Sequence, residues 1–175
     1  WLIFPNLGAG ILWQDEAETA TLARCIVKHG CPLADDGSPP LDRSGHSLWA
    51  ITDQRPRPDG SFVDINADGI WIWTSWFGNY LTAGSLLVFD ALGLNDTMER
   101  KTLAARFPFA LGAWLTLAVM YVALTDICGN RRTSRVAVIL LALCVPYILF
   151  ARQCRSYPYL SLYTLLQTWG YIRMT

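Results

Sequence analysis

Two adjacent carboxylates near the start of the chain are suited to acid–base chemistry. Asp15 and Glu16 follow an uncharged, apolar run that ends at Trp13. A carboxylate placed where an apolar segment meets water can accept a proton from a hydroxyl group or orient that hydroxyl for attack. Capping of a helix is the alternative role, with Asp15 as N-cap and Glu18 at the third position. The two roles can coexist, because this cap does not use Glu16.

Two arginines further along the chain are suited to binding phosphate. Arg152 and Arg155 follow another apolar run, and no acidic residue stands nearby in the sequence to pair with them. The guanidinium group offers phosphate a planar fork of donors. The alternative is that both side chains reach lipid headgroups without recognising one particular phosphate. We expect either a phosphate site or an anchor at the membrane surface.

The remaining titratable residues give weaker signals. His46 has no second histidine at metal-ligand spacing, and Asp68 is better explained as a helix cap than as a ligand. The five cysteines show no C-x-x-C spacing, although Cys25 and Cys31 are close enough in the chain for a disulfide. The sequence contains neither a glycine-rich phosphate loop nor a serine nucleophile elbow.

The amount and balance of charge in the chain narrow the class of protein to which these residues belong. Of the 175 residues, 53% are apolar and 16% are charged, whereas a soluble domain carries about 25% charged residues. The 14 Lys and Arg balance the 14 Asp and Glu, so the formal net charge is +0. This balance argues against a basic nucleic-acid-binding protein and against an acidic disordered chain. We expect no nucleic acid among the partners.

Long runs without charge predict a membrane protein. A transmembrane helix needs about 20 mostly apolar residues, and we predict such helices over residues 107–126, 136–151 and 157–173. Residues 1–13 are apolar but too short to span, and we interpret them as the end of a first transmembrane helix. The alternative, a soluble all-α core, would have to bury helices that are apolar on every side. We expect an all-α, multi-pass helical bundle that continues in a C-terminal remainder.

A long first loop, residues 14–106, should carry two amphipathic helices. Apolar spacing predicts the first over about residues 16–29, ended by Gly30, and the Pro-rich residues 32–60 predict an irregular segment after it. The second covers about residues 70–89, an uncharged run that is also long enough to span. We favour a helix lying in the membrane interface, because its aromatic residues fall on one face: Trp73, Trp76, Phe77 and Tyr80. Asp96 and Glu99 predict the cap of the next helix.

Basic residues in one short turn predict the orientation. Arg131, Arg132 and Arg135 mark the turn at residues 128–135 as cytoplasmic. The long loop and the turn at residues 152–157 then share the outer side, together with Asp15 and Arg155. A span at residues 69–89 would instead invert the orientation of everything after it. We expect a multi-pass protein of a bacterial inner or plasma membrane with an extracytoplasmic active site.

The order of four short segments resembles that of the GT-C membrane glycosyltransferases. The segments are WQDEA at 13–17 with AR at 23–24, YLTA at 80–83, AARFPFAL at 104–111 and ARQCRSY at 151–157. The resemblance covers nearly the whole chain, which is similar to the N-terminal third of such an enzyme. The pattern is nearest to protein O-mannosyltransferases and to bacterial aminoarabinose-to-lipid-A transferases.

This resemblance implies an enzyme that moves a sugar from a polyprenyl-phosphate carrier to an acceptor, which is a protein, a lipid such as lipid A, or a glycan. It implies that Asp15 is the catalytic base, with Glu16 beside it. It also implies that Arg152, Arg155 and Tyr157 bind the donor phosphate. The resemblance implies no definite cofactor, and it leaves open whether a divalent metal takes part.

The chain also departs from this family. Many relatives have Lys-Pro-Pro just before the YLTA-like segment, where this chain has Thr74, Ser75 and Trp76. A lysine expected to help with the lipid phosphate is therefore absent, and the donor sugar and acceptor stay open. Two other functions are alternatives. One is a transporter or lipid-binding module whose arginines bind an anionic lipid without catalysis, and the other is a non-catalytic membrane subunit.

Overall fold

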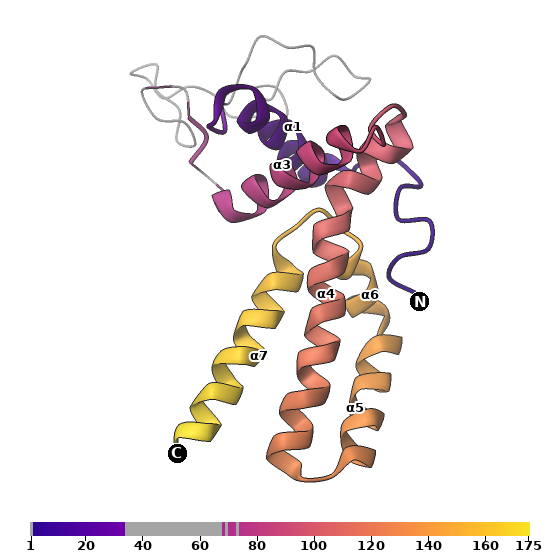
Figure 1. Cartoon of the computed structure of the whole chain (residues 1–175), viewed down its shortest axis with the longest axis vertical. Coiled ribbons are helices and arrows are strands. Elements are labelled where there is room, and N and C mark those ends of the chain that lie inside the picture. The colour runs from indigo at the N-terminus through magenta and orange to yellow at the C-terminus, as the bar shows by residue number, and fades with distance from the viewer. Residues whose placement is uncertain (1, 34–67, 69, 73) are drawn as a thin grey trace. The chain divides into compact units, whose positions relative to one another are not determined.

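The computed structural model describes residues 2–33, 68, 70–72 and 74–175, and the regular structure in them is helical. The helices are α1 (Gln14–His29), α3 (Trp76–Ala91), α4 (Met98–Cys128), α5 (Arg131–Leu143), α6 (Val145–Ala151) and α7 (Tyr157–Met174) (Figure 1). Within this part of the chain, the extended pairing is limited to one antiparallel bridge between Leu33 and Ile70. The expected all-α class is thus confirmed for the described residues. The Pro-rich residues 34–60, with His46, lie outside them.

The chain divides into two compact units. The first, here called the long-helix unit, comprises Trp1–Leu7 and Arg106–Thr175, and the second, the α1–α3 unit, comprises Gly8–Ala105. Helix α4 begins in the α1–α3 unit and continues into the long-helix unit.

In the α1–α3 unit, α1 packs along α3 through small apolar side chains. Ala23 and Ile26 of α1 meet Ala83 of α3, and Leu86 packs against them. Gly30 ends α1 with φ +79°, and its N–H donates to the Ile26 carbonyl over 2.8 Å. This left-handed cap was predicted, because glycine adopts positive φ without a Cβ clash. The predicted helix over residues 16–29 is confirmed with its start two residues earlier.

Helix α3 begins at Trp76, six residues later than predicted. Before it, Ile70 forms the antiparallel bridge with Leu33, and the N–H of Trp71 donates to the carbonyl of Pro32 over 2.9 Å. The Trp71 indole is buried and donates to Thr74, and the Trp76 indole donates in turn to the Trp71 carbonyl. The outward face of α3 is nevertheless apolar, as predicted, and carries Trp76, Phe77, Tyr80, Leu87 and Val88. Trp73 lies outside the described residues.

Helix α4 begins where a helix was expected, but with a different cap. The Arg100 N–H donates to Thr97 Oγ1 over 3.3 Å, so Thr97 occupies the capping position. Asp96 instead pairs with the Arg100 side chain at 2.9 Å. The predicted cap by Asp96 and Glu99 was therefore wrong by one residue.

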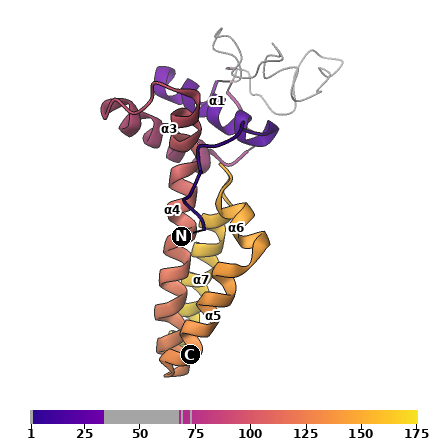
Figure 2. The same ribbon diagram turned by 90° about the vertical axis from the view of Figure 1, so that its right-hand side faces the viewer.

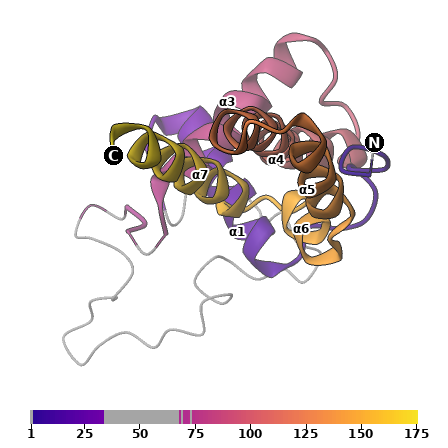
Figure 3. The same cartoon turned by 90° about the horizontal axis from the view of Figure 1, so that it is seen from below.

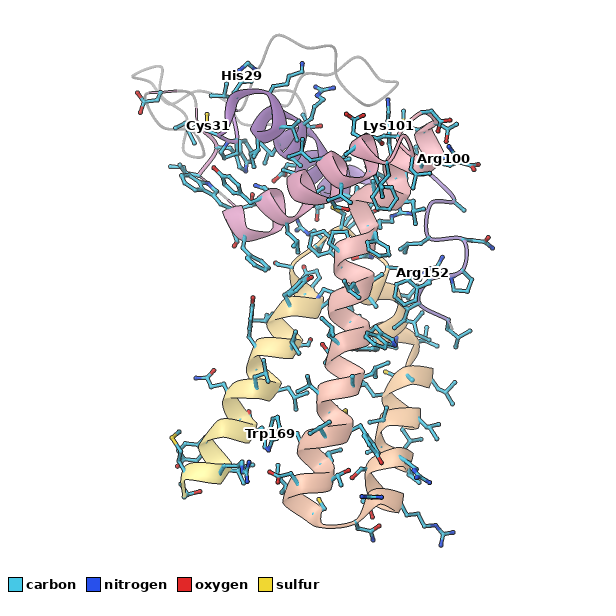
Figure 4. All side chains as sticks on the ribbon, in the orientation of Figure 1. His29, Cys31, Arg100, Lys101, Arg152 and Trp169 are labelled. Atoms are coloured by element: carbon cyan, nitrogen blue, oxygen red, sulfur yellow. The ribbon has the colours of Figure 1, made fainter. Side chains whose placement is uncertain are left out.

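In the long-helix unit, α4 is flanked by α7 on one side and by α5 with α6 on the other (Figures 1 and 3). Helices α4 and α7 run parallel. At one end the Tyr159 hydroxyl donates to the Pro108 carbonyl over 2.9 Å. At the other end the Trp169 indole donates to Asp126 Oδ2 over 2.8 Å, and the Arg173 guanidinium lies 3.3 Å from the same oxygen (Figure 4).

The predicted transmembrane helices compare with the structure as follows. Residues 107–126 lie inside α4, which among the described helices is the single one long and apolar enough by itself to cross a membrane. Residues 157–173 match α7, which lacks this property because Ser161, Thr164, Gln167 and Thr168 interrupt its apolar surface.

The predicted single helix over residues 136–151 was wrong. It is broken at Cys144 into α5 and α6, whose axes are bent by 67° (Figure 2). Pro146 explains the break, because it has no N–H to donate to the carbonyl of Ala142 and its ring disfavours the helix before it. Together the bent pair is apolar enough to be one broken span.

The interpretation of residues 1–13 as a helix end was also wrong for the described residues 2–13, which form turns. Pro5 removes a backbone donor, and Asn6 and Gly10 have positive φ of 54° and 82°. The backbone of this segment is held instead by arginine side chains, described below.

Candidate functional site

The predicted site residues form two clusters, one in each unit. Asp15 and Glu16 lie together in the first turn of α1, in the α1–α3 unit. Arg152, Arg155 and Tyr157 lie together in the turn from α6 to α7, in the long-helix unit. We describe these as an acidic cluster and a basic cluster.

In the acidic cluster, Glu16 is the capping residue of α1. Its Oε2 accepts a hydrogen bond from the backbone N–H of Trp13 over 3.3 Å, and its side chain is only 1% exposed. The predicted cap by Asp15 and Glu18 was therefore wrong. Because α1 begins two residues earlier than that cap required, Glu16 occupies the third helical position. Glu16 thus has a structural role.

Asp15 lies in the same turn as Glu16 and takes no part in this cap. Its side chain is half-buried, and its carbonyl accepts a hydrogen bond from Thr19 Oγ1 over 3.1 Å. The first turn of a helix favours negative charge, because the aligned backbone dipoles place partial positive charge there. The capped first turn of α1 therefore holds Asp15 in a fixed position.

A buried polar group of α3 was missed by the sequence reasoning. Asn79 is 2% exposed, and its Nδ2 has no hydrogen-bond partner among the described residues. Thr82 next to it is fully buried and donates to the Gly78 carbonyl over 2.9 Å. Their helical spacing could have indicated this burial, because both residues fall on the side of α3 opposite its exposed aromatic face.

In the basic cluster, Arg152 clamps the N-terminal segment. Its Nη1 donates to the Leu2 carbonyl over 3.0 Å and its Nη2 to the Asn6 carbonyl over 3.2 Å (Figure 4). Arg106 assists with a 3.1 Å hydrogen bond to the Leu7 carbonyl. Each terminal nitrogen of Arg152 therefore donates one hydrogen bond to backbone, so Arg152 has a structural role.

Arg155, the second predicted phosphate ligand, lies in the turn between α6 and α7. It is half-buried, and its backbone N–H donates to the Gln153 carbonyl over 2.8 Å, which tightens the turn. Cys154 between them is fully buried. Tyr157 follows as the first residue of α7, 43% exposed, and its ring packs edge-on against Phe150 at 5.1 Å between centroids.

An apolar pocket adjoins the basic cluster. Its volume is about 240 Å³, and it is lined by Ala113 of α4, Tyr147, Phe150 and Ala151 of α6, and Tyr157, Pro158, Leu160 and Ser161 of α7. The Tyr147 hydroxyl is occupied by the Ala113 carbonyl at 2.6 Å. The walls therefore offer mainly hydrocarbon, and Ala151 and Tyr157 directly flank the turn that carries Arg155.

Metal and disulfide chemistry find little support in the part of the chain that the structure describes. There, no three His, Cys, Asp or Glu side chains come together as metal ligands. Cys25 and Cys31, which are close enough in the chain for a disulfide, are not joined in one. Cys25 instead faces the interior of the α1–α3 unit, because it lies on the buried side of α1.

Comparisons with known proteins add no identification. No protein-family model, curated protein or solved structure matches this chain.

Proposed function

We propose that the chain is part of a membrane glycosyltransferase that moves a sugar from a polyprenyl-phosphate carrier to an acceptor. The observation that carries this proposal is the apolar pocket whose lining residues Ala151 and Tyr157 flank, in the chain, the turn that carries Arg155. A lipid phosphate needs an apolar surface for its chain and a cation for its headgroup, and the pocket and this turn could supply them. The acceptor, whether protein, lipid or glycan, is left open by the proposal.

A bilayer setting supports a lipid substrate. The part of α4 in the long-helix unit, residues 106–128, is about 34 Å long at about 1.5 Å per residue, and a hydrocarbon core is about 30 Å thick. Large apolar side chains of this unit that are at least 40% exposed include Trp114, Val122, Ile127, Val136, Ile139, Leu140, Leu143, Leu149, Leu160, Leu166 and Ile172. A surface of this kind suits lipid better than water. We propose a multi-pass protein whose basic cluster faces the extracytoplasmic side.

In the proposed reaction, the Asp15 carboxylate accepts the proton of the acceptor hydroxyl. The hydroxyl oxygen forms a bond to the anomeric carbon, and the bond from that carbon to the phosphate oxygen breaks. The electron pair leaves with polyprenyl phosphate, whose charge a cation must stabilise, and the family resemblance gives this role to Arg155. Glu16 is a positioning residue, because its cap fixes the turn that carries Asp15.

The test is the release of polyprenyl phosphate from a radiolabelled polyprenyl-phosphate sugar by the full-length protein in membranes. Asp15→Asn should lower turnover by 10²-fold or more, within the range of about 10²–10⁴ for general bases, and leave carrier binding intact. Arg155→Ala should weaken carrier binding. Asp96→Asn and Arg100→Ala, which affect an exposed ion pair, are matched controls and should keep wild-type activity.

Two results would count against the proposal. Full activity of Asp15→Asn would reduce this residue to a local structural role. Carrier binding without release by the wild type would favour the transporter or lipid-binding module instead.

A further inference from the structure

One face of α5 is basic at its start and apolar along the rest. At about 100° per residue, seven side chains fall within an arc of about 140° of the helix: Arg131, Arg132, Arg135, Val136, Ile139, Ala142 and Leu143. The large apolar ones, Val136, Ile139 and Leu143, are 52%, 55% and 59% exposed, in that order. The opposite face holds Ser134, which is fully buried. The basic and apolar parts are therefore one continuous, outward surface, here called the α5 face.

The positive charge of the α5 face is not neutralised within the described structure. Arg131, Arg132 and Arg135 are all exposed, and none of the three forms an ion pair with a described residue. Arg173, by contrast, pairs with Asp126. The backbone amides at the start of α5 are already satisfied, because Asn130 Oδ1 accepts hydrogen bonds from the N–H groups of Arg132 and Thr133. Binding of an anion here would therefore rely on the guanidinium groups.

The length of the α5 face matches one leaflet of a bilayer. From Arg135 to Leu143 the helix rises about 12 Å, and from Arg131 about 18 Å, at about 1.5 Å per residue. Half of a hydrocarbon core of about 30 Å is about 15 Å. A lipid whose phosphate lies at the arginines would thus place its acyl chain along Val136, Ile139 and Leu143.

We propose that the α5 face binds an anionic phospholipid of the bilayer, with the headgroup on the three arginines and an acyl chain on the apolar residues. Charge selects this occupant, because three unpaired guanidinium groups above an apolar strip complement a negative headgroup better than a zwitterionic one. The site lies at the opposite end of the long-helix unit from the basic cluster, since α5 begins at the turn after α4 (Figure 1). It is independent of the proposed sugar transfer and needs no donor sugar.

The test uses the full-length protein in phosphatidylcholine vesicles and measures lipid association by spin-labelled phosphatidylglycerol and phosphatidylcholine. The wild type should select phosphatidylglycerol. The triple variant Arg131→Gln, Arg132→Gln, Arg135→Gln should lower this selectivity at least about fivefold at low salt, as expected for one basic contact with an anionic surface. A triple Arg→Lys variant keeps the charge and should keep most of the selectivity, and 0.5 M salt should weaken it through screening.

Arg100→Gln with Lys101→Gln provides a matched control, because both side chains are exposed cations of the other unit. This variant should select phosphatidylglycerol as the wild type does. Equal association of both lipids with the wild type would overturn the proposal, and so would undiminished selectivity in the triple Gln variant. The latter result would assign the α5 face to a protein partner.

Discussion

Replacement of Gly112 by alanine tests the packing of α4 against α7. A Cβ at this position would lie 2.8 Å from Cε2 and 2.9 Å from Cζ of Tyr159. The ring cannot easily withdraw, because its hydroxyl is held by the Pro108 carbonyl at 2.9 Å. Overpacking of this kind costs about 1–3 kcal/mol, whereas alanine gains about 1 kcal/mol over glycine within a helix. The change in the free energy of unfolding is the sum of these two opposing contributions. A control variant is therefore needed to measure the cost of overpacking by itself.

Gly170→Ala in α7 is that control, since a Cβ at this position would meet no atom within 4 Å. Gly170→Ala should stabilise the protein slightly, and Gly112→Ala should be less stable than Gly170→Ala by about 1–3 kcal/mol. Thermal unfolding in detergent, followed by circular dichroism, gives the melting temperature of each variant. A change of about 2–4 °C in melting temperature is expected for each kcal/mol of stability. Addition of Tyr159→Leu should recover part of the loss in Gly112→Ala. Equal melting temperatures for the two alanine variants would refute the close contact between α4 and α7.

Two further predictions concern the clusters. Glu16→Ala should lower the free energy of unfolding by about 1 kcal/mol through loss of the α1 cap, while Glu16→Gln, whose amide oxygen can still accept from Trp13, should lose less. Equal losses in chemical denaturation would argue against the cap. Arg152→Ala should speed hydrogen exchange in residues 2–7, because their carbonyl clamp is removed, whereas Arg155→Ala should leave that exchange unchanged. An unchanged rate in Arg152→Ala would contradict the clamp.

The sequence predicted those elements that depend on local pattern. The apolar spacing of α1, its left-handed end at Gly30 and the charge-free run within α4 all follow from residues close together in the chain. The outward aromatic face of α3 was likewise visible in the spacing of Trp76, Phe77 and Tyr80. Local periodicity is sufficient here because each helix buries one stripe and exposes another.

Features that depend on distant contacts could not be predicted in this way. Arg152 contacts Leu2 and Asn6, which lie 150 and 146 residues away in the chain. The break at Cys144 did have a local signal in Pro146, but the uncharged run from 136 to 151 outweighed it. The cap by Glu16 depends on where α1 begins, and helix boundaries are the least certain part of pattern reasoning.

The break between α5 and α6 has a consequence for membrane insertion. Pro146 leaves the Ala142 carbonyl without its usual helical partner, and in hydrocarbon each unpaired backbone group costs several kcal/mol. Helix α4 also contains a proline, Pro108, but there the Ala104 carbonyl accepts a hydrogen bond from Ser85 Oγ over 2.6 Å. In a bilayer the bent pair would need neighbouring protein to shield its open backbone, and α6 contacts α4 through the hydrogen bond from the Tyr147 hydroxyl to the Ala113 carbonyl. Helix α4 precedes α5 and α6 in the chain and is therefore synthesised before them. We expect α4 to be already in place as the surface against which the broken pair inserts.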